Sequence, residues 1–247
     1  MSDRLPQPLV LGVIPARGGS KGILRKNLRL LAGQPLIAHA IQAAKQAGSL
    51  DRLIVTTDDE EIRQAALRCG AEAPFLRPKE LAEDLTPDLP VFEHVLAWLA
   101  EQERCVPEIL VHLRPTSPLR RPEDIDEGVR LLLAHPEADS VRSVCTPSQN
   151  PFKMWRIVGG RLQPLVQGPG PEPYNTPRQQ LPDVWWQTGE VDVTRRQTIL
   201  GKRSMTGDVI LPLVTEYRRP LDLDSAADLE YAELMLAKRA RTGAEVG

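Results

Sequence analysis

Short apolar runs alternate with longer segments of helical period through the first half of the chain. The apolar runs are Leu9 to Ile14, Arg52 to Thr56, Ala73 to Leu76, Glu108 to Leu113 and Ser140 to Cys145. Strands that alternate with helices predict an α/β domain with a largely parallel sheet. The expected helices are Pro35 to Ala47, Asp59 to Arg68, Asp88 to Gln102 and Pro122 to Leu133. The loops that follow the strands should therefore gather at one edge of the sheet, where open α/β sheets bind ligands.

The composition changes after about Ser148. Residues 150–182 are dense in Pro, Gly and Gln, and half of the chain's Trp, Tyr and Phe residues lie between Phe152 and Trp186. A long disordered loop is one interpretation, but disordered segments are usually poor in aromatic residues, which favours a protruding subdomain that packs on a partner subunit. A strand at Val209 to Leu213, an extended piece at Pro220 to Leu223 and a helix from Ala226 to about Arg239 follow. We expect a core of residues 1–148 and 198–247 and an insertion at 149–197 for dimerisation and sugar binding.

The overall charge and the cysteines exclude several classes of protein. A net charge of -2 gives no general attraction to nucleic acid or anionic membrane, so phosphate binding must depend on local basic groups. The three cysteines are far apart and lack CxxC spacing, which argues against a disulfide framework or a zinc site. No run approaches the roughly 20 apolar residues of a membrane span, and Met1 to Pro8 lacks a signal-peptide stretch. We expect a cytoplasmic protein that binds neither nucleic acid nor membrane.

A glycine-rich loop follows the first predicted strand directly. It reads Val13-Ile14-Pro15-Ala16-Arg17-Gly18-Gly19-Ser20-Lys21-Gly22. Its glycines allow successive backbone N–H groups to form an anion-binding nest, and Arg17, Lys21 and Lys26 add charge suited to a triphosphate. The spacing matches neither GxxxxGK[ST] nor GxGxxG. An ordinary glycine-rich turn is the alternative to a nucleotide-binding loop.

Two carboxylates near the C-terminus form a second feature. Asp222 and Asp224 are two residues apart, so in an extended chain they share a face and can reach one hard cation such as magnesium. Alternatively, Asp224 supports the N-terminus of the final helix. The four histidines have no metal-ligand spacing, and none is predicted to be a catalyst.

Two loops after predicted strands offer further polar groups. One is Arg77-Pro78, and the other is Arg114-Pro115-Thr116-Ser117-Pro118-Leu119-Arg120. In the second loop, two prolines restrict the backbone while hydroxyl and guanidinium groups are presented close together. Both loops follow strands on the expected ligand side, which favours a binding role over a solvated loop.

Taken in order, these motifs resemble those of the CMP-sialic acid synthetases, the acylneuraminate cytidylyltransferases. The resemblance spans nearly the whole chain. The matching segments are Ile14 to Gly22, Lys26-Asn27, Thr57-Asp58, Leu76-Arg77-Pro78, Glu80-Leu81-Ala82 with Asp84, Pro115 to Arg120, Pro151-Phe152-Lys153, Pro177-Arg178-Gln179 and Asp222-Leu223-Asp224. Short signatures in a fixed order are far more specific than any one motif.

The resemblance implies a three-layer α/β/α nucleotide-diphospho-sugar transferase-like fold and a homodimer in which the insertion crosses to the partner. It implies transfer of CMP from CTP to the anomeric hydroxyl of a sialic-acid-like 2-keto-3-deoxy sugar acid, with release of pyrophosphate. The implied catalytic residues are Arg17, Lys21, Asp222 and Asp224, of which Asp222 and Asp224 would bind Mg²⁺. The implied nucleotide-binding residues are Ala16, Arg17, Gly18, Gly19, Ser20, Lys21, Lys26, Asn27 and Arg77.

The sequence departs from that family near the expected sugar pocket. Arg114 stands where the synthetases usually carry Gln, and Thr188-Gly189-Glu190-Val191-Asp192 replaces Asn-Gly-Ala-Ile-Tyr. We hypothesise that Arg114 and Asp192 form a compensating charge pair. The predicted substrate-binding residues are Arg114, Thr116, Ser117, Lys153, Arg178, Thr188 and Asp192. Two alternatives stay open: a same-fold enzyme that uses GTP, UTP or a sugar 1-phosphate acceptor, and a non-catalytic nucleotide- or sugar-binding protein.

Overall fold

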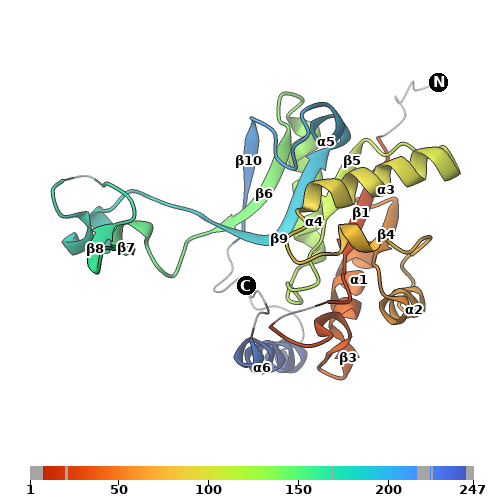
Figure 1. Cartoon of the computed structure of the whole chain (residues 1–247), viewed down its shortest axis with the longest axis horizontal. Coiled ribbons are helices and arrows are strands. Elements are labelled where there is room, and N and C mark those ends of the chain that lie inside the picture. The colour runs from red at the N-terminus through yellow and green to blue at the C-terminus, as the bar shows by residue number, and fades with distance from the viewer. Residues whose placement is uncertain (1–7, 20–21, 169, 216–222, 224, 243–247) are drawn as a thin grey trace.

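A mixed six-stranded sheet forms the centre of the molecule (Figure 1). The computed structural model describes residues 8–19, 22–168, 170–215, 223 and 225–242. In the order β10-β6-β9-β5-β1-β4, the strands are β10 (Ile210–Val214), β6 (Ser140–Cys145), β9 (Trp186–Arg195), β5 (Ile109–His112), β1 (Val10–Pro15) and β4 (Arg52–Thr56). β9 pairs antiparallel with β5 and β6, whereas the other pairs in this sheet are parallel. The predicted α/β class is confirmed.

Helices cover both faces of the sheet. α1 (Leu36–Gln46), α2 (Glu60–Arg68) and α4 (Pro122–Ala134) share one apolar cluster with the strands, and α3 (Asp88–Glu103) and α5 (Arg196–Gly201) share the other. Successive residues of β1 alternate between the two clusters: Ile14 joins the first, and Leu11 and Val13 join the second. This period of two is what a strand buried on both faces requires. The expected three-layer α/β/α arrangement is confirmed.

The final helix, α6 (Ala226–Thr242), packs beside the short strand that contains Leu31. Its buried Ala232 packs with Leu31, Leu119 and Leu223 in a third apolar cluster. Leu31 belongs to β2 (Leu30–Leu31), which pairs with β3 (Gln34–Pro35). The 3-10 helices are η1 (Lys26–Leu28), η2 (Lys79–Leu81), η3 (Pro151–Lys153), η4 (Pro173–Asn175) and η5 (Arg178–Gln180). No helix in the described part of the chain is both long and apolar enough to cross a membrane.

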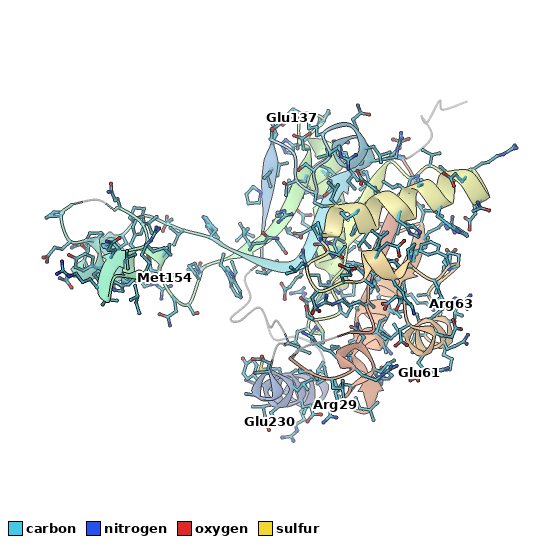
Figure 2. All side chains as sticks on the ribbon, in the orientation of Figure 1. Arg29, Glu61, Arg63, Glu137, Met154 and Glu230 are labelled. Atoms are coloured by element: carbon cyan, nitrogen blue, oxygen red, sulfur yellow. The ribbon has the colours of Figure 1, made fainter. Side chains whose placement is uncertain are left out.

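A small hairpin projects far from the sheet between β6 and β9 (Figure 1). It is formed by β7 (Trp155–Val158) and β8 (Arg161–Pro164), and every residue of both strands is exposed. Figure 2 shows Met154 on this projection, well away from the labelled residues of the core. β9 lies inside the range 149–197 that we expected as an insertion, but its Val191 and Val193 are buried in the core. The projecting part of that range therefore ends before β9.

The predicted strand at Ala73 to Leu76 is wrong. The preceding residue, Glu72, forms an isolated bridge with Ile54, and the chain then leaves the sheet. Phe75 packs into the cluster on the α3 side instead, so apolar burial without backbone pairing explains the apolar pattern. The strand predicted at Val209 to Leu213 is present as β10. Apart from Leu223, the extended piece expected at 220–223 lies outside the described residues.

Candidate functional site

A cavity of about 470 Å³ opens at the carboxyl ends of β1 and β5, beside the start of α3. Parallel strands bring the loops that follow them to this edge, as the sequence predicted. Of the predicted site residues, the cavity brings together Arg17, Lys26, Asn27, Arg77, Arg114 and Thr116. The basic members come from three separate loops and can bind an anionic ligand, although Glu83, Asp84 and Asp88 also line the cavity.

The glycine-rich loop is braced by the end of β4. The Ala16 N–H donates to the Thr56 carbonyl at 3.0 Å, and the Gly18 N–H donates to Asp58 Oδ1 at 2.9 Å. A side chain at Gly18 would clash, because its Cβ would lie 2.8 Å from an Asp59 carboxylate oxygen. The loop thus needs glycine here for close approach to the acidic residues after β4. Ser20 and Lys21 lie outside the described residues.

Arg17 and Asn27 are joined across the loop. The Asn27 side-chain amide donates to the Arg17 carbonyl at 3.0 Å, and Asn27 is buried. The Arg17 guanidinium donates to the Glu83 carbonyl at 2.9 Å and lies 3.2 Å from Asp84. Both residues line the cavity, but Asn27 also acts as a brace that the motif alone did not predict. Gly19 has open space around its Cβ position.

Arg77 is a buried cation at the cavity wall. Its side chain is 4% exposed, and its Nη2 lies 3.9 Å from Asp58 Oδ1, beyond hydrogen-bond distance. Burial is the largest influence on this guanidinium and lowers the pKa of Arg77. Its Nε and Nη2 atoms have no hydrogen-bond partner in the described part of the chain. Unpaired buried donors are costly, so these two atoms are an unfavourable feature of the cavity wall.

Leu223 connects the basic loop to the loop after β5. The Lys26 Nζ donates to the Leu223 carbonyl at 2.6 Å, and the Leu223 N–H donates to the Thr116 carbonyl at 3.2 Å. Leu223 is fully buried. Its neighbours Asp222 and Asp224, the predicted metal ligands, lie outside the described residues. Among the residues that are described, no group of three or more His, Cys, Asp or Glu side chains could hold a metal ion.

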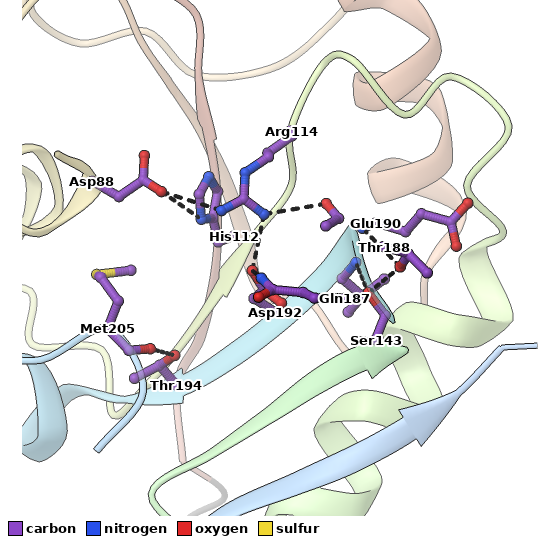
Figure 3. Close-up of polar contacts among 12 residues, drawn as sticks. Asp88, His112, Arg114, Ser143, Gln187, Thr188, Glu190, Asp192, Thr194 and Met205 are labelled. Carbon is purple, nitrogen blue, oxygen red and sulfur yellow. Dashed lines mark hydrogen bonds and ion pairs between the residues drawn. The ribbon is translucent and has the colours of Figure 1, made fainter. Parts of the chain in front are cut away.

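Arg114 is held between two carboxylates (Figure 3). Its Nη1 lies 2.9 Å from Asp192 Oδ2, and its Nη2 lies 3.2 Å from Asp88 Oδ2. Burial disfavours the charged guanidinium, but Asp192 and Asp88 together outweigh that effect and raise the pKa of Arg114. The charge pair hypothesised from the sequence is therefore in contact. Asp88, in the first turn of α3, was not predicted as a site residue.

His112 lies beside this cluster. The β5–β9 register places it directly opposite Asp192, and its Nδ1 is 3.8 Å from Asp88 Oδ2. Burial, followed by the nearby Arg114, lowers the pKa of His112 well below its ordinary value, so the ring is neutral. Its Nε2 has no hydrogen-bond partner among the described residues. His112 lines the large cavity, and only the pairing of two distant strands identifies it as part of the site.

A second cavity of about 210 Å³ lies on the other side of Arg114. Its lining includes the predicted residues Thr116, Ser117 and Thr188, together with Trp186. The β6–β9 register shifts next to Ser143, and the Thr188 hydroxyl donates to Ser143 Oγ at 2.7 Å. Bulges of this kind redirect side chains beside functional sites. The bulge thus forms part of the wall of this smaller cavity, which shares Arg114 and Thr116 with the larger one.

Lys153 and Arg178 lie away from both cavities. The Lys153 Nζ donates to the Tyr174 carbonyl at 3.2 Å, and the Arg178 Nη2 donates to the Pro147 carbonyl at 2.6 Å. Arg178 lines a separate cavity of about 230 Å³ near the base of the projection. Within one chain, these two predicted sugar-acid contacts do not join the other site residues.

The chain is similar in sequence to known proteins over most of its length. Residues 11–204 match a protein-family model described as cytidylyltransferase. The chain is 41% identical over 122 residues to CMP-N,N'-diacetyllegionaminic acid synthase of Legionella pneumophila, covering 49% of the chain and 52% of that protein. It is 30% identical over 232 residues to N-acylneuraminate cytidylyltransferase of Escherichia coli, covering 94% of the chain and 53% of that protein. The chain thus matches about half the length of each of these two relatives.

A solved structure shares the fold. It is described as CMP:2-keto-3-deoxy-manno-octonic acid synthetase complexed with CTP, and it superposes with a TM-score of 0.66 at 18% identity. The match covers 94% of this chain and 99% of that one. At this identity, the similarity supports the three-layer fold.

The Arg114–Asp192 pair predicts a specific stability pattern. Asp192→Ala should lower the free energy of unfolding by about 3 kcal/mol, because it leaves a largely enclosed guanidinium with one of its two carboxylates. Arg114→Gln combined with Asp192→Asn should cost less than Asp192→Ala alone, since the charge that remains, on Asp88, is 43% exposed and can be solvated. Urea unfolding followed by circular dichroism measures both. Asp208→Ala, which removes an exposed partner of Lys202, is the control and should change little. A double variant less stable than Asp192→Ala would contradict the pairing.

Proposed function

The chain belongs to the cytidylyltransferase family, and we propose that it transfers CMP from CTP to the anomeric hydroxyl of a sialic-acid-like 2-keto-3-deoxy sugar acid. The observation that carries this proposal is the cavity in which Arg17, Lys26 and Arg77 adjoin Arg114 and Thr116. Basic side chains at one end suit a triphosphate, and the second cavity across Arg114 suits an acceptor. The two relatives are named for cytidylyl transfer to sugar acids.

In the reaction, the anomeric oxygen forms a bond to the α-phosphorus of CTP. The bond from that phosphorus to the oxygen bridging the α- and β-phosphates breaks, pyrophosphate leaves with the bonding electrons, and the hydroxyl proton passes to solvent. Such a transfer needs charge neutralisation and alignment rather than a covalent protein intermediate. Arg17, Lys21 and Arg77 would neutralise the phosphates, and the position of Arg17 and Arg77 in the cavity lining supports that role. Lys26 would connect the phosphate site to the segment around Leu223.

Asp222 and Asp224 would hold Mg²⁺. Two carboxylates that flank one residue are a donor set that this hard cation prefers. The contacts of the intervening Leu223 with Lys26 and Thr116, both of which line the cavity, support this role. When bound, the ion would neutralise phosphate charge and lower the pKa of the attacking hydroxyl.

A homodimer would complete the acceptor site. Ile157 and Leu162 are cross-strand partners on the projecting hairpin, and they are 76% and 62% exposed. Exposed apolar residues gathered on a projection are typical of an interaction surface, and a second copy of this chain would cover them. Lys153 and Arg178 line neither of the two cavities around Arg114 in their own chain, which supports a role for them in binding the acceptor in the partner's site. The three free thiols fit a reducing cytoplasm.

The proposed reaction predicts a defined substrate requirement. Purified protein with Mg²⁺ should release pyrophosphate from CTP in the presence of a 2-keto-3-deoxy sugar acid, because a nucleotide and an acceptor hydroxyl are both needed. The measurement is pyrophosphate release with each of four NTPs against a panel of sugar acids and sugar 1-phosphates. Release only with GTP or UTP and a sugar 1-phosphate would replace this proposal with the same-fold alternative. Nucleotide binding without any release would favour a non-catalytic binding protein.

The metal role predicts different effects at two neighbouring acidic residues. Asp224→Asn should reduce turnover to near zero with little change in stability, because it removes a metal ligand. Asp228→Asn is the matched control: Asp228 accepts hydrogen bonds from Ser225 at the start of α6, so its loss should cost about 1 kcal/mol of stability and leave turnover intact. The measurements are pyrophosphate release and thermal unfolding. Normal turnover by Asp224→Asn would refute the metal assignment.

The dimer predicts that charge on the hairpin separates the subunits. Ile157→Glu with Leu162→Glu should give a monomer in sedimentation velocity, because carboxylates cannot be buried against a second copy. Leu67→Glu, at an exposed apolar position on α2, should leave the dimer intact. Mixing the separately inactive variants Arg17→Ala and Lys153→Ala should restore partial activity if sites are shared between subunits. A dimer that persists in the hairpin variant, or a monomeric wild type, would contradict the proposal.

A further inference from the structure

Arg114 lies at the boundary between the two cavities. It lines the large cavity that contains Arg17 and Arg77, and it also lines the smaller cavity beside Trp186. Its side chain is 29% exposed, so part of the guanidinium faces open space. A bound nucleotide and a bound acceptor would therefore meet near this side chain. Its orientation decides which polar groups the acceptor finds there.

The guanidinium is held from opposite sides by rigid elements. Asp192 lies on β9, buried in the sheet, and Asp88 lies in the first turn of α3. The α3 helix is anchored one turn later by Phe92, which is fully buried and whose ring contacts His112 with centroids 4.9 Å apart. His112 in turn faces Asp192 across the β5–β9 ladder. Neither carboxylate can move far without disturbing the core.

These contacts use part of the donor capacity of Arg114. A guanidinium has five N–H groups. Nη1 donates to Asp192 Oδ2 and, at 3.4 Å, to the Gly189 carbonyl, while Nη2 donates to Asp88 Oδ2. Within the described part of the chain, the Nε and one Nη2 hydrogen have no partner. Arg114 thus retains N–H donors of fixed direction, while its charge is already neutralised by two carboxylates.

We propose that Asp88 is a positioning residue that, together with Asp192, holds Arg114 as the determinant of acceptor specificity. This inference rests on the proposed cytidylyltransferase activity and names the group that the acceptor must present. Directional donors with a satisfied charge select a neutral oxygen, either a hydroxyl or an acylamino carbonyl, on the acceptor. A second carboxylate on the acceptor gains less there, because Asp88 and Asp192 already occupy the guanidinium.

The test separates acceptor binding from nucleotide binding. Asp88→Asn should raise the KM for the acceptor about tenfold, the effect of one charge-assisted hydrogen bond, and change the KM for CTP less than about twofold. In an Arg114→Gln background, Asp88→Asn should have no further effect, because Asp88 acts through Arg114. Wild-type protein should prefer sugar acids with a hydroxyl or acylamino group over an analogue with a carboxylate at the same ring position. That preference should shrink in Asp88→Asn.

A matched control removes effects on helix stability. Glu123 lies in the first turn of α4 and pairs with Arg121 at 3.2 Å, so Glu123→Gln removes an equivalent first-turn charge at a residue that lines neither cavity. It should leave both KM values unchanged.

Four results would each overturn the inference while wild-type turnover stands. They are an unchanged acceptor KM in Asp88→Asn, an equal rise in the KM for CTP, effects of Asp88→Asn and Arg114→Gln that add, and a wild-type preference for the carboxylate analogue. No pyrophosphate release by the wild type with any sugar acid would refute the proposed function, and no calorimetric binding of a sugar acid would refute both.

Discussion

The pairing of β9 with β5 and β6 is the interaction on which the rest of the site depends. It joins strands that would otherwise belong to two separate sheets, and its Val191 and Val193 complete the core under α4. Because strand side chains alternate, the same pairing directs Asp192 to the opposite face, beside His112. A shift of register by one residue would exchange these faces and bury Asp192 in the apolar cluster.

Arg120 stabilises the contact between β9 and the loop that follows β5. It is fully enclosed, and it donates to the Glu190 carbonyl on β9 and, at 2.6 Å, to the Arg114 carbonyl. Burial, the largest influence, lowers the pKa of Arg120 to about 10, which still leaves it charged at neutral pH. A buried cation is tolerated when it is hydrogen-bonded to several acceptors. Arg120 thus ties the loop after β5 to the bulge of β9, and both cavity walls depend on that tie.

The parallel strands and the basic loop were predictable because their signals are local. Apolar runs of strand length, glycine spacing and the loop after β5 are each read within a few residues. β9 was not predicted as part of the sheet, because its buried Val191 and Val193 alternate with polar residues in a segment that follows a long projection. The apolar run that ends at Leu76 produced the opposite error, a predicted strand that is absent. Phe75 is apolar because it packs into the core cluster on the α3 side, and its burial resembles that of a strand residue. Asp88 carried no signal, because acidic residues in the first turn of a helix are common.

Under the proposed function, the division between the two cavities would allow acceptor specificity to change while the phosphate site stays intact. Among the described residues of the basic loop, Gly18 contacts Asp58 at the end of β4 and Arg17 contacts Glu83 and Asp84, and neither contacts β9. The acceptor side instead depends on Arg114 and Asp192, which are far apart in the sequence. Replacing Arg114 alone leaves the buried Asp192 carboxylate without its cation, and replacing Asp192 alone leaves Arg114 with only Asp88, so the two positions must change together. Under the proposed function, we therefore expect a change of acceptor to require coupled replacement at this pair rather than single substitutions along the cavity wall.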